Sequence, residues 1–160
     1  MYASQFARIA HAFGLDVIAW SENLAPEKAR EHGARWVSKE DLFRHADFLT
    51  IHLILSNRTR GLVGKAELGL MKPTARLVNT SRGPIIDEAA LIDALGKRQI
   101  AGAAIDVFDI EPLPQDHAFR QLDNVVATPH IGFVSRDLYR VFYQDTVANI
   151  ATWLQRNARL

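Results

Sequence analysis

The sequence predicts an α/β fold, a doubly wound parallel sheet built as a single domain over residues 1–160. Two observations support this. Short apolar segments of strand length alternate with segments of helical periodicity along the chain, and each strand segment is apolar throughout, as in strands covered by helices on both faces. A chain of 160 residues, 48% hydrophobic and 23% charged, is also long enough to bury one sizeable core.

Helix and strand segments alternate through the first half of the chain. Apolar residues recur at helical spacing before Gly14, which predicts a helix over 3–13. Pro26 suits the first turn of a helix over 26–32, and Ser38 followed by Asp41 is typical of a capping box that starts a helix over 39–45. The apolar runs between these helices predict strands over 17–20, 34–37 and 48–53.

The same alternation continues through the second half. Helices are expected over 65–71, 87–97 and 135–156, where apolar residues again recur at helical spacing. Short apolar runs predict strands over 76–79, 101–108 and 125–128.

Composition narrows the classes of partner. The chain has 19 basic and 18 acidic residues and a net charge of +1, so no global field predicts a nucleic acid or a membrane surface as partner. The absence of cysteine excludes disulfides, thiolate catalysis and cysteine-ligated metals. No metal site is expected, because His11, His32, His45 and His117 lack ligand spacing. With no apolar run near ~18 residues and no leader pattern, the expected location is cytoplasmic.

Charged residues follow three predicted strands at their carboxyl ends. Arg82 lies in TSRGP, Asp106 and Glu111 lie in DVFDIEP, and His130 lies in ATPHIG. Each is weak evidence alone, since a lone arginine is usually a surface residue and the acid or the histidine fits an ordinary loop. Together they are aimed at one crevice, because ligands of a parallel sheet bind outside the carboxyl ends of the strands.

These residue types suit chemistry on a small acid. Arg82 can hold a carboxylate or a carbonyl oxygen in a two-pronged grip that lysine cannot reproduce. His130 can carry a proton, and a neighbouring carboxylate such as Glu111 can fix its orientation. With a dinucleotide for the hydride, the set would reduce a 2-keto acid to a 2-hydroxy acid or catalyse the reverse reaction.

Three segments resemble the signature segments of the D-isomer-specific 2-hydroxyacid dehydrogenases, a family that includes glyoxylate/hydroxypyruvate reductases and phosphoglycerate dehydrogenases. They are LVNTSRGPIIDEAALIDAL, AGAAIDVFDIEPLP and NVVATPHIG. The resemblance implies a Rossmann-like domain, with Arg82 on the substrate, Glu111 paired with His130, and Asp106 on the nicotinamide carboxamide. Glu111 argues against a formate dehydrogenase, since these enzymes usually carry glutamine there.

The resemblance also implies where the cofactor lies. Family members line it with the loop that here begins at His52 and Leu53, and with the stretch that contains Thr80; His130 borders it from the catalytic side. An NAD enzyme should place an acid after the second strand of the fold, whereas this chain has Ser21 followed by Glu22. Glu22 would repel a 2′-phosphate, which favours NAD, with NADP as the alternative; Ser21 as a simple strand end remains a third interpretation.

The chain begins at a helix, where the family has a strand and a glycine-rich turn. We therefore expect a nucleotide-binding domain that lacks its first strand, with the substrate domain absent. One hypothesis is an oxidoreductase domain that is weak or inactive alone, acts on a small 2-hydroxy or 2-keto acid and forms a homodimer. It is either truncated or completed by a separate amino-terminal piece. The alternative is a non-catalytic remnant that dimerises or binds a partner through an unpaired sheet edge.

Overall fold

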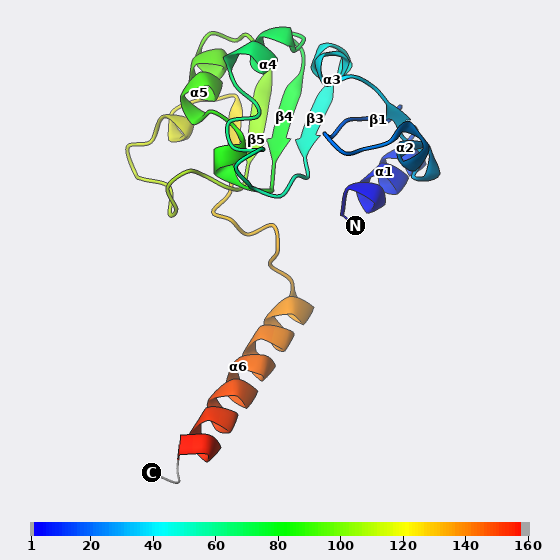
Figure 1. Ribbon diagram of the computed structural model, residues 1–160. Coiled ribbons are helices and arrows are strands. Elements are labelled where there is room, and N and C mark those ends of the chain that lie inside the picture. The colour runs from blue at the N-terminus through cyan, green and yellow to red at the C-terminus, as the bar shows by residue number, and fades with distance from the viewer. Residues whose placement is uncertain (1, 158–160) are drawn as a thin grey trace. The chain divides into compact units, whose positions relative to one another are not determined.

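Parallel strands form the centre of the fold. The computed structural model describes residues 2–157 and divides the chain into two compact units, Met1–Pro129 and His130–Leu160, which are described separately. In the first unit, the strands pair in the order β3 (Phe48–Ile51), β4 (Arg76–Asn79), β5 (Gly102–Ile105) and β6 (Val125–Ala127). A separate sheet pairs β1 (Ile18–Ala19) with β2 (Arg35–Trp36). All pairs are parallel, and the arrows of β3 and β4 point the same way in Figure 1.

Helices connect the strands of the first unit. They are α1 (Tyr2–Ala12), α2 (Pro26–Glu31), α3 (Lys39–His45), α4 (Lys65–Leu70) and α5 (Glu88–Gly96), with short 3-10 helices η1 (Gly83–Ile85) and η2 (Ala118–Arg120). Helix α4 packs between α3 and α5. This alternation confirms the predicted doubly wound, Rossmann-like α/β fold.

Burial alternates along the strands of the larger sheet. Leu49, Leu77 and Ile105 are buried in the main core, whereas Thr50 and Val78 on the opposite face are only half-buried. Equal cover on both faces, which the apolar strands predicted, is therefore not found. The main core draws its buried side chains from residues 43–119, and the buried side chains before Phe43 are small ones outside it: Ala7, Ala10, Ala29, Ala34 and Val37.

The division into two sheets falls at a defined place in the strand order. Doubly wound dinucleotide-binding sheets have the order 3-2-1-4-5-6. Here β2 and β1 correspond to strands 3 and 2, and β3 begins the run from strand 4 onward, so the break lies where strand 1 of that order would stand. This agrees with the expectation that the first strand is lacking.

The break leaves one edge of β1 and one edge of β3 unpaired among the described residues. The carbonyl of Asp47 accepts from the Arg76 N–H of β4 (2.9 Å), and the carbonyl of Val17 accepts from the Arg35 N–H of β2 (2.8 Å). Because backbone groups of successive strand residues alternate in direction, those of Phe48 face away from β4 and those of Ile18 away from β2. Both open edges therefore present backbone hydrogen-bonding groups.

Capping residues fix two helix starts, of which the cap at Ser38 was predicted. The Ser38 hydroxyl accepts from the Asp41 N–H (3.1 Å), and the Asp87 carboxylate accepts from the Ala90 N–H (3.0 Å), so α3 and α5 begin after these residues.

Several strands are shorter than predicted. The run expected over 101–108 pairs as a strand only over Gly102–Ile105, because Val107 and Phe108 leave the sheet and are buried in the interior as loop residues. An apolar run alone does not distinguish a buried strand from a buried loop. The expected strand over 48–53 likewise ends at Ile51, and β1 and β2 have two residues each.

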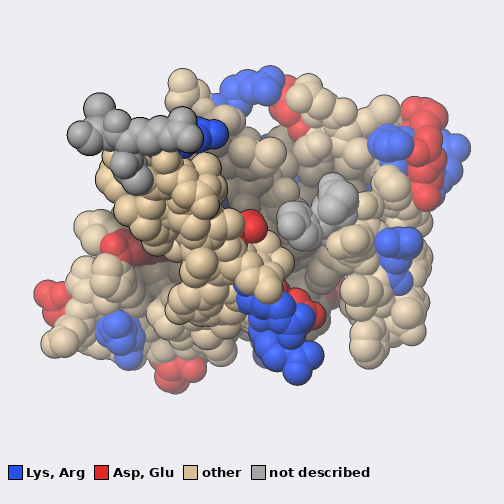
Figure 2. Space-filling view, turned by 90° about the horizontal axis from the view of Figure 1, so that it is seen from below, with Lys and Arg blue, Asp and Glu red and all other residues tan. Residues whose placement is uncertain are grey.

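Charged side chains of both signs are scattered over the surface. The face in Figure 2 shows lysines and arginines interspersed with acids among neutral residues, in keeping with the net charge of +1.

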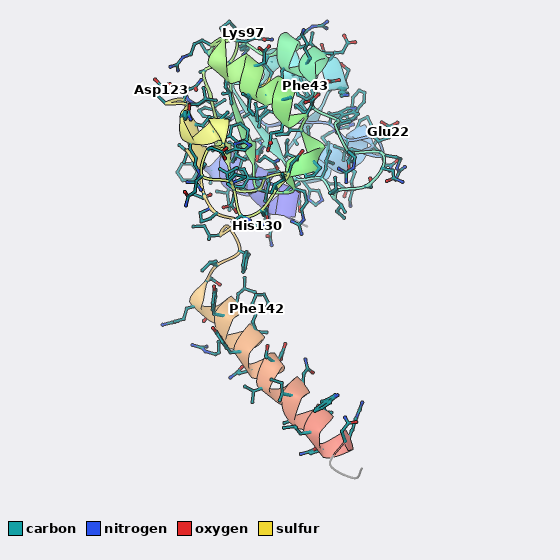
Figure 3. The ribbon with its side chains drawn as sticks, turned by 90° about the vertical axis from the view of Figure 1, so that its left-hand side faces the viewer. Glu22, Phe43, Lys97, Asp123, His130 and Phe142 are labelled. Carbon is teal, nitrogen blue, oxygen red and sulfur yellow. The ribbon has the colours of Figure 1, made fainter. Side chains whose placement is uncertain are left out.

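The second unit contains one long helix, α6 (Arg136–Asn157). Its first turn is capped by the Ser135 hydroxyl, which accepts from the Leu138 N–H (3.2 Å). No residue of α6 is buried, and Phe142 projects from it in Figure 3. None of the described helices is long and apolar enough to cross a membrane.

Candidate functional site

The loop after β4 carries Arg82, and the side chain of Asn79, the last residue of the strand, holds this loop by hydrogen bonds. Asn79 is fully buried; its side-chain amide donates to the Arg82 carbonyl (2.9 Å) and its side-chain oxygen accepts from the Ser81 N–H (3.0 Å). The Arg82 side chain is exposed, and its Nη1 donates to the Ser81 carbonyl (2.6 Å). Thr80 is exposed at the same strand end. The buried amide therefore shapes the loop and leaves the guanidinium at the surface.

The loop after β3 lies beside this loop. The Ser81 hydroxyl donates to the Leu53 carbonyl, which ties the two strand ends together. The His52 ring stands 5.2 Å from the Phe6 ring of α1, and its Nε2 lies 3.2 Å from the Thr50 hydroxyl. Although much of His52 reaches solvent, partial burial lowers the pKa of its imidazole. His52, Leu53 and Thr80 thus lie at neighbouring strand ends.

Asp106 follows β5 and is one of the few buried polar residues. Only 5% of it is exposed, and its Oδ1 accepts from the Thr128 hydroxyl at 2.5 Å, just after β6. Its backbone N–H donates to the Asn79 carbonyl (3.0 Å), which extends the β4–β5 pairing by one residue. The carboxylate is thereby fixed between the ends of three adjacent strands.

Glu111 is exposed, on the long segment between β5 and β6. Its Oε1 accepts from the Phe108 N–H (2.9 Å), so the carboxylate is held back toward its own loop. This loop packs directly on the Arg82 loop: a Cβ placed on the buried Gly83 would lie 2.7 Å from the Asp109 nitrogen and closer still to the Phe108 carbonyl group. Only glycine allows the loops of Arg82 and Glu111 to approach this closely.

His130 is the first residue of the second unit. Its backbone has φ of +53°, in the left-handed region that few non-glycine residues adopt, and its ring contacts Phe133 edge-on at 6.0 Å. The structure places Arg82, Glu111 and Asp106 within the first unit. The pairing of Glu111 with His130 stays a prediction.

Ser21 and Glu22 follow β1 in the smaller sheet. Ser21 is half-buried, and its carbonyl accepts from the Leu24 N–H (3.1 Å) in a tight turn. Glu22 is exposed at the surface of the first unit, as Figure 3 shows. A carboxylate therefore stands close to the carboxyl end of β1, one position later than the usual acid.

Sequence reasoning missed the residues that shape these loops. Asn79 and Gly83 hold or admit the predicted side chains, yet neither was singled out, since a buried amide at a strand end and a close backbone approach leave no periodic signal. The only hint was the run of small and polar residues in NTSRG. Within residues 2–157, no three histidine, aspartate or glutamate residues are grouped as a metal site would require.

Comparison with known proteins identifies the family. Residues 2–132 match the family described as D-isomer specific 2-hydroxyacid dehydrogenase, NAD binding domain. The chain is 47% identical to a glyoxylate reductase of Aeropyrum pernix over 134 residues, which are 84% of this chain and 40% of that protein. A glyoxylate reductase of Thermococcus litoralis is 44% identical over 131 residues, 82% of this chain and 39% of that protein.

Solved structures agree. A putative D-3-phosphoglycerate dehydrogenase from Ralstonia solanacearum superposes with a TM-score of 0.86 at 39% identity, over 94% of this chain and 44% of that one. The NAD-complexed D-isomer specific 2-hydroxyacid dehydrogenase of Lactobacillus delbrueckii superposes with a TM-score of 0.75 at 29% identity, over 93% of this chain and 50% of that one.

The chain spans about two fifths of the length of these curated relatives. The match nevertheless covers most of the chain, includes all three signature segments and agrees with the strand order. The chain belongs to the D-isomer specific 2-hydroxyacid dehydrogenase family and corresponds to its NAD-binding domain.

Proposed function

We propose that this chain is the nucleotide-binding part of an oxidoreductase that transfers a hydride between a nicotinamide cofactor and a small D-2-hydroxy or 2-keto acid. The observation that carries the proposal is the packing of the Arg82 loop on the Glu111 loop through Gly83, beside the buried carboxylate of Asp106. An arginine, two acids and cofactor-lining residues at adjacent parallel strand ends support a ligand site in this crevice.

The residues present fit the two ends of a dinucleotide. Asp106, fixed by Thr128, is an acceptor for a carboxamide N–H, and Thr80 and His52 lie at the neighbouring strand ends. Ser21 and Glu22 stand where ribose hydroxyls would be held. No glycine precedes α1 in this sequence, so the glycine-rich turn that usually meets the pyrophosphate is not among these residues. The bound nicotinamide would supply or accept the hydride.

The protein side chains would do the rest of the chemistry. Arg82 would hold the substrate carboxylate and carbonyl oxygen with its paired N–H groups. His130 would give a proton to the carbonyl oxygen during reduction and take one from the hydroxyl during oxidation. Glu111 would orient the His130 ring. His130→Ala should therefore abolish turnover while NADH affinity stays nearly unchanged; surviving turnover would remove His130 from this role.

The cofactor is proposed to be NAD, with NADP as the alternative. Glu22 is exposed and would stand near a 2′-phosphate, which it would repel. Glu22→Gln should therefore improve NADPH binding more than NADH binding. An equal effect on both cofactors would place Glu22 away from the adenine ribose.

Cofactor titration tests the proposal directly. The purified 160-residue chain is titrated with NADH and then with NADPH, followed by nicotinamide fluorescence. Saturable binding would justify assays with glyoxylate, hydroxypyruvate and pyruvate, in which Arg82→Ala should lose turnover. Absence of binding to either cofactor would mean that the catalytic residues are stranded in a fragment without a working cofactor site, and the search would move to a missing amino-terminal piece.

The open sheet edges favour a second candidate function, a non-catalytic module that dimerises or binds a partner strand. The outward backbone groups of Phe48 and Ile18 can pair with another chain. Phe48→Pro tests this, since it removes an outward N–H and spares the bonds to β4. Loss of a dimer in sedimentation equilibrium, with no change in cofactor binding, would support edge pairing. If the parent chain and the Phe48→Pro variant are both monomers at every concentration, the result contradicts this candidate function and also the expected homodimer.

A further inference from the structure

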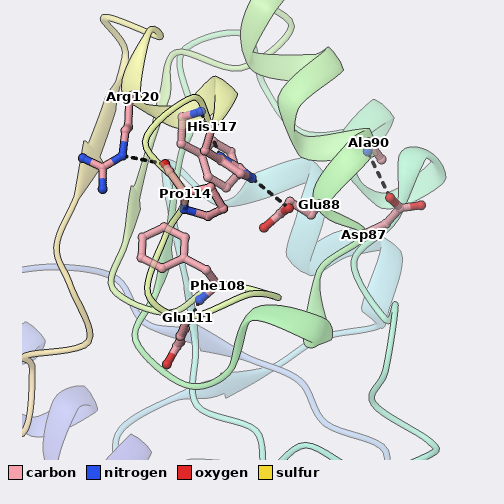
Figure 4. Close-up of polar contacts among 9 residues, drawn as sticks. Asp87, Glu88, Ala90, Phe108, Glu111, Pro114, His117 and Arg120 are labelled. Carbon is pink, nitrogen blue, oxygen red and sulfur yellow. Dashed lines mark hydrogen bonds and ion pairs between the residues drawn. The ribbon is translucent and has the colours of Figure 1, made fainter.

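The hydrogen bond between His117 and Glu88 joins the two segments that carry the predicted site residues. Glu88 opens α5, six residues after Arg82, and His117 lies just before η2, six residues after Glu111. The His117 Nε2 stands 3.1 Å from the Glu88 Oε1, and both side chains are mostly shielded, with 16% and 24% exposed. The pair lies within the first unit and takes no part in the chemistry proposed above (Figure 4).

The second ring nitrogen of His117 fixes which way the contact points. Its Nδ1 accepts from the Phe119 N–H (3.2 Å), so the proton of the neutral ring lies on Nε2. That proton is donated to the Glu88 carboxylate. The imidazole is thus held at both nitrogens, and the β5–β6 segment is anchored on the first turn of α5.

A continuous set of contacts leads from this anchor to Glu111. The His117 ring packs on Phe119 with ring centres 4.9 Å apart, and Phe119 packs on Phe108 at 6.2 Å. The Phe108 N–H in turn donates to the Glu111 Oε1 (2.9 Å). Phe108 and Phe119 are buried, so displacement of one ring must move its neighbour.

The segment itself is braced by Arg120. Its Nε donates to the Pro114 carbonyl (2.8 Å) and its Nη2 to the Leu113 carbonyl (3.0 Å), which closes the stretch between Glu111 and His117 on itself. A displacement of His117 should therefore also displace Glu111, because Arg120 holds the residues between them in a fixed conformation.

Like charges act against the contact between the two segments. Burial raises the pKa of Asp109, the negative charges of Glu88 and Asp87 raise it further, and the positive charge of Arg60 lowers it. Asp109 lies on the same segment as Glu111. Without the donor at His117, the carboxylate of Glu88 would keep its repulsion with Asp109 and lose a hydrogen bond.

We infer that Glu88 and His117 are positioning residues, which together hold Glu111 at a set place relative to the Arg82 loop. The importance of that place for turnover rests on the proposed function. This contact between Glu88 and His117, called the clamp below, is a property of the ligand-free chain, and its effect on Glu111 can be measured without any catalytic assay.

The experiment follows the Phe108 amide by NMR hydrogen exchange in the full chain, because this N–H reports the bond to Glu111. Glu88→Ala and His117→Phe should each speed its exchange by about tenfold. This is the factor expected from loss of the single hydrogen bond between the His117 N–H and the charged Glu88 carboxylate. His117→Phe keeps a ring against Phe119. Glu88→Gln retains an acceptor oxygen and should restore slow exchange.

Two further measurements distinguish a positioning role from a general loss of stability: the tautomer of His117 and the Phe108 exchange in a control variant. The His117 ring should show a proton on Nε2 in the parent chain and in Glu88→Gln. Glu67→Ala is the control, because it breaks a comparably shielded ion pair. The Lys39 Nζ lies 2.8 Å from the Glu67 Oε1, and the two side chains are 31% and 22% exposed. This variant should leave the hydrogen exchange of Phe108 unchanged. Unchanged Phe108 exchange in Glu88→Ala, or an equal rise in Glu67→Ala, would overturn the inference.

Turnover assays then test the link to the reaction. If the chain reduces a 2-keto acid, Glu88→Ala should lower kcat by about tenfold and leave the KM for NADH near the parent value. Faster Phe108 exchange with unchanged kcat would make the pair merely structural and overturn its positioning role. A chain that binds NADH without any turnover agrees with a nucleotide-binding part that is inactive alone, and a chain that binds neither NADH nor NADPH contradicts the proposed function. In both cases the hydrogen exchange of Phe108 and the tautomer of His117 still decide whether Glu88 and His117 hold Glu111 in place.

Discussion

Gly83→Ala should destabilise the protein strongly although it adds a single methyl group. The new Cβ would meet the backbone at the Asp109 nitrogen, 2.7 Å away, and must move at least about 0.7 Å to reach the 3.4 Å of an ordinary contact. Both sides of the contact are backbone, so no side chain can rotate away. We expect a loss near the upper end of the range for overpacking, about 3 kcal/mol.

The assay is urea unfolding followed by circular dichroism. With a slope of about 2 kcal/mol per molar urea, the midpoint should fall by roughly 1.5 M at unchanged slope. Gly96→Ala is the matched control: it lies at the end of α5, nothing stands within 4 Å of its Cβ, and alanine should be neutral or gain up to about 1 kcal/mol. A Gly83→Ala midpoint within error of the parent would refute the close approach of the two loops.

Asn79→Ala should cost about 2–3 kcal/mol in urea unfolding, because the Arg82 carbonyl and the Ser81 N–H each lose a partner; a cost below about 0.5 kcal/mol would mean that water replaces the amide. The lowered pKa of His52 means that the unfolded chain binds more protons below pH 6.5, so this residue reduces stability as pH falls below that value and has no effect above it. His52→Phe should therefore narrow the difference in thermal midpoint between about pH 8 and about pH 5.5. An unchanged difference would contradict the lowered pKa of His52.

Much of the fold followed from the sequence, since helical and strand periodicity is set by the local alternation of apolar and polar residues. The cap Ser38 was visible for the same reason, because it bonds within three residues, whereas Asp87 was expected inside its helix and caps it instead. The division of the sheet was inferred from the order of the elements. The lengths of the strands were not, since Val107 and Phe108 are apolar and buried without being paired.

The candidate site was predictable only in part. Arg82, Asp106 and Glu111 stood out as charged residues at strand ends, and the family signatures assigned their roles. The supports were not visible, because the bond from Asn79 to Arg82 and the contact between His117 and Glu88 depend on how loops meet in space. His117 was considered only as a metal ligand, and its actual partners are a carboxylate and a backbone N–H.

The small buried side chains of the first 37 residues have a consequence for how the chain opens. Since they lie outside the main core, this part should unfold locally at lower free energy than the sheet of β3 to β6. Within the first unit, trypsin should then cut first near Arg30 and Arg35, both exposed, and leave a resistant fragment that contains Asp106. A dinucleotide held by Ser21 at one end and Asp106 at the other would bridge the two parts, and protection from this early cut would report its binding.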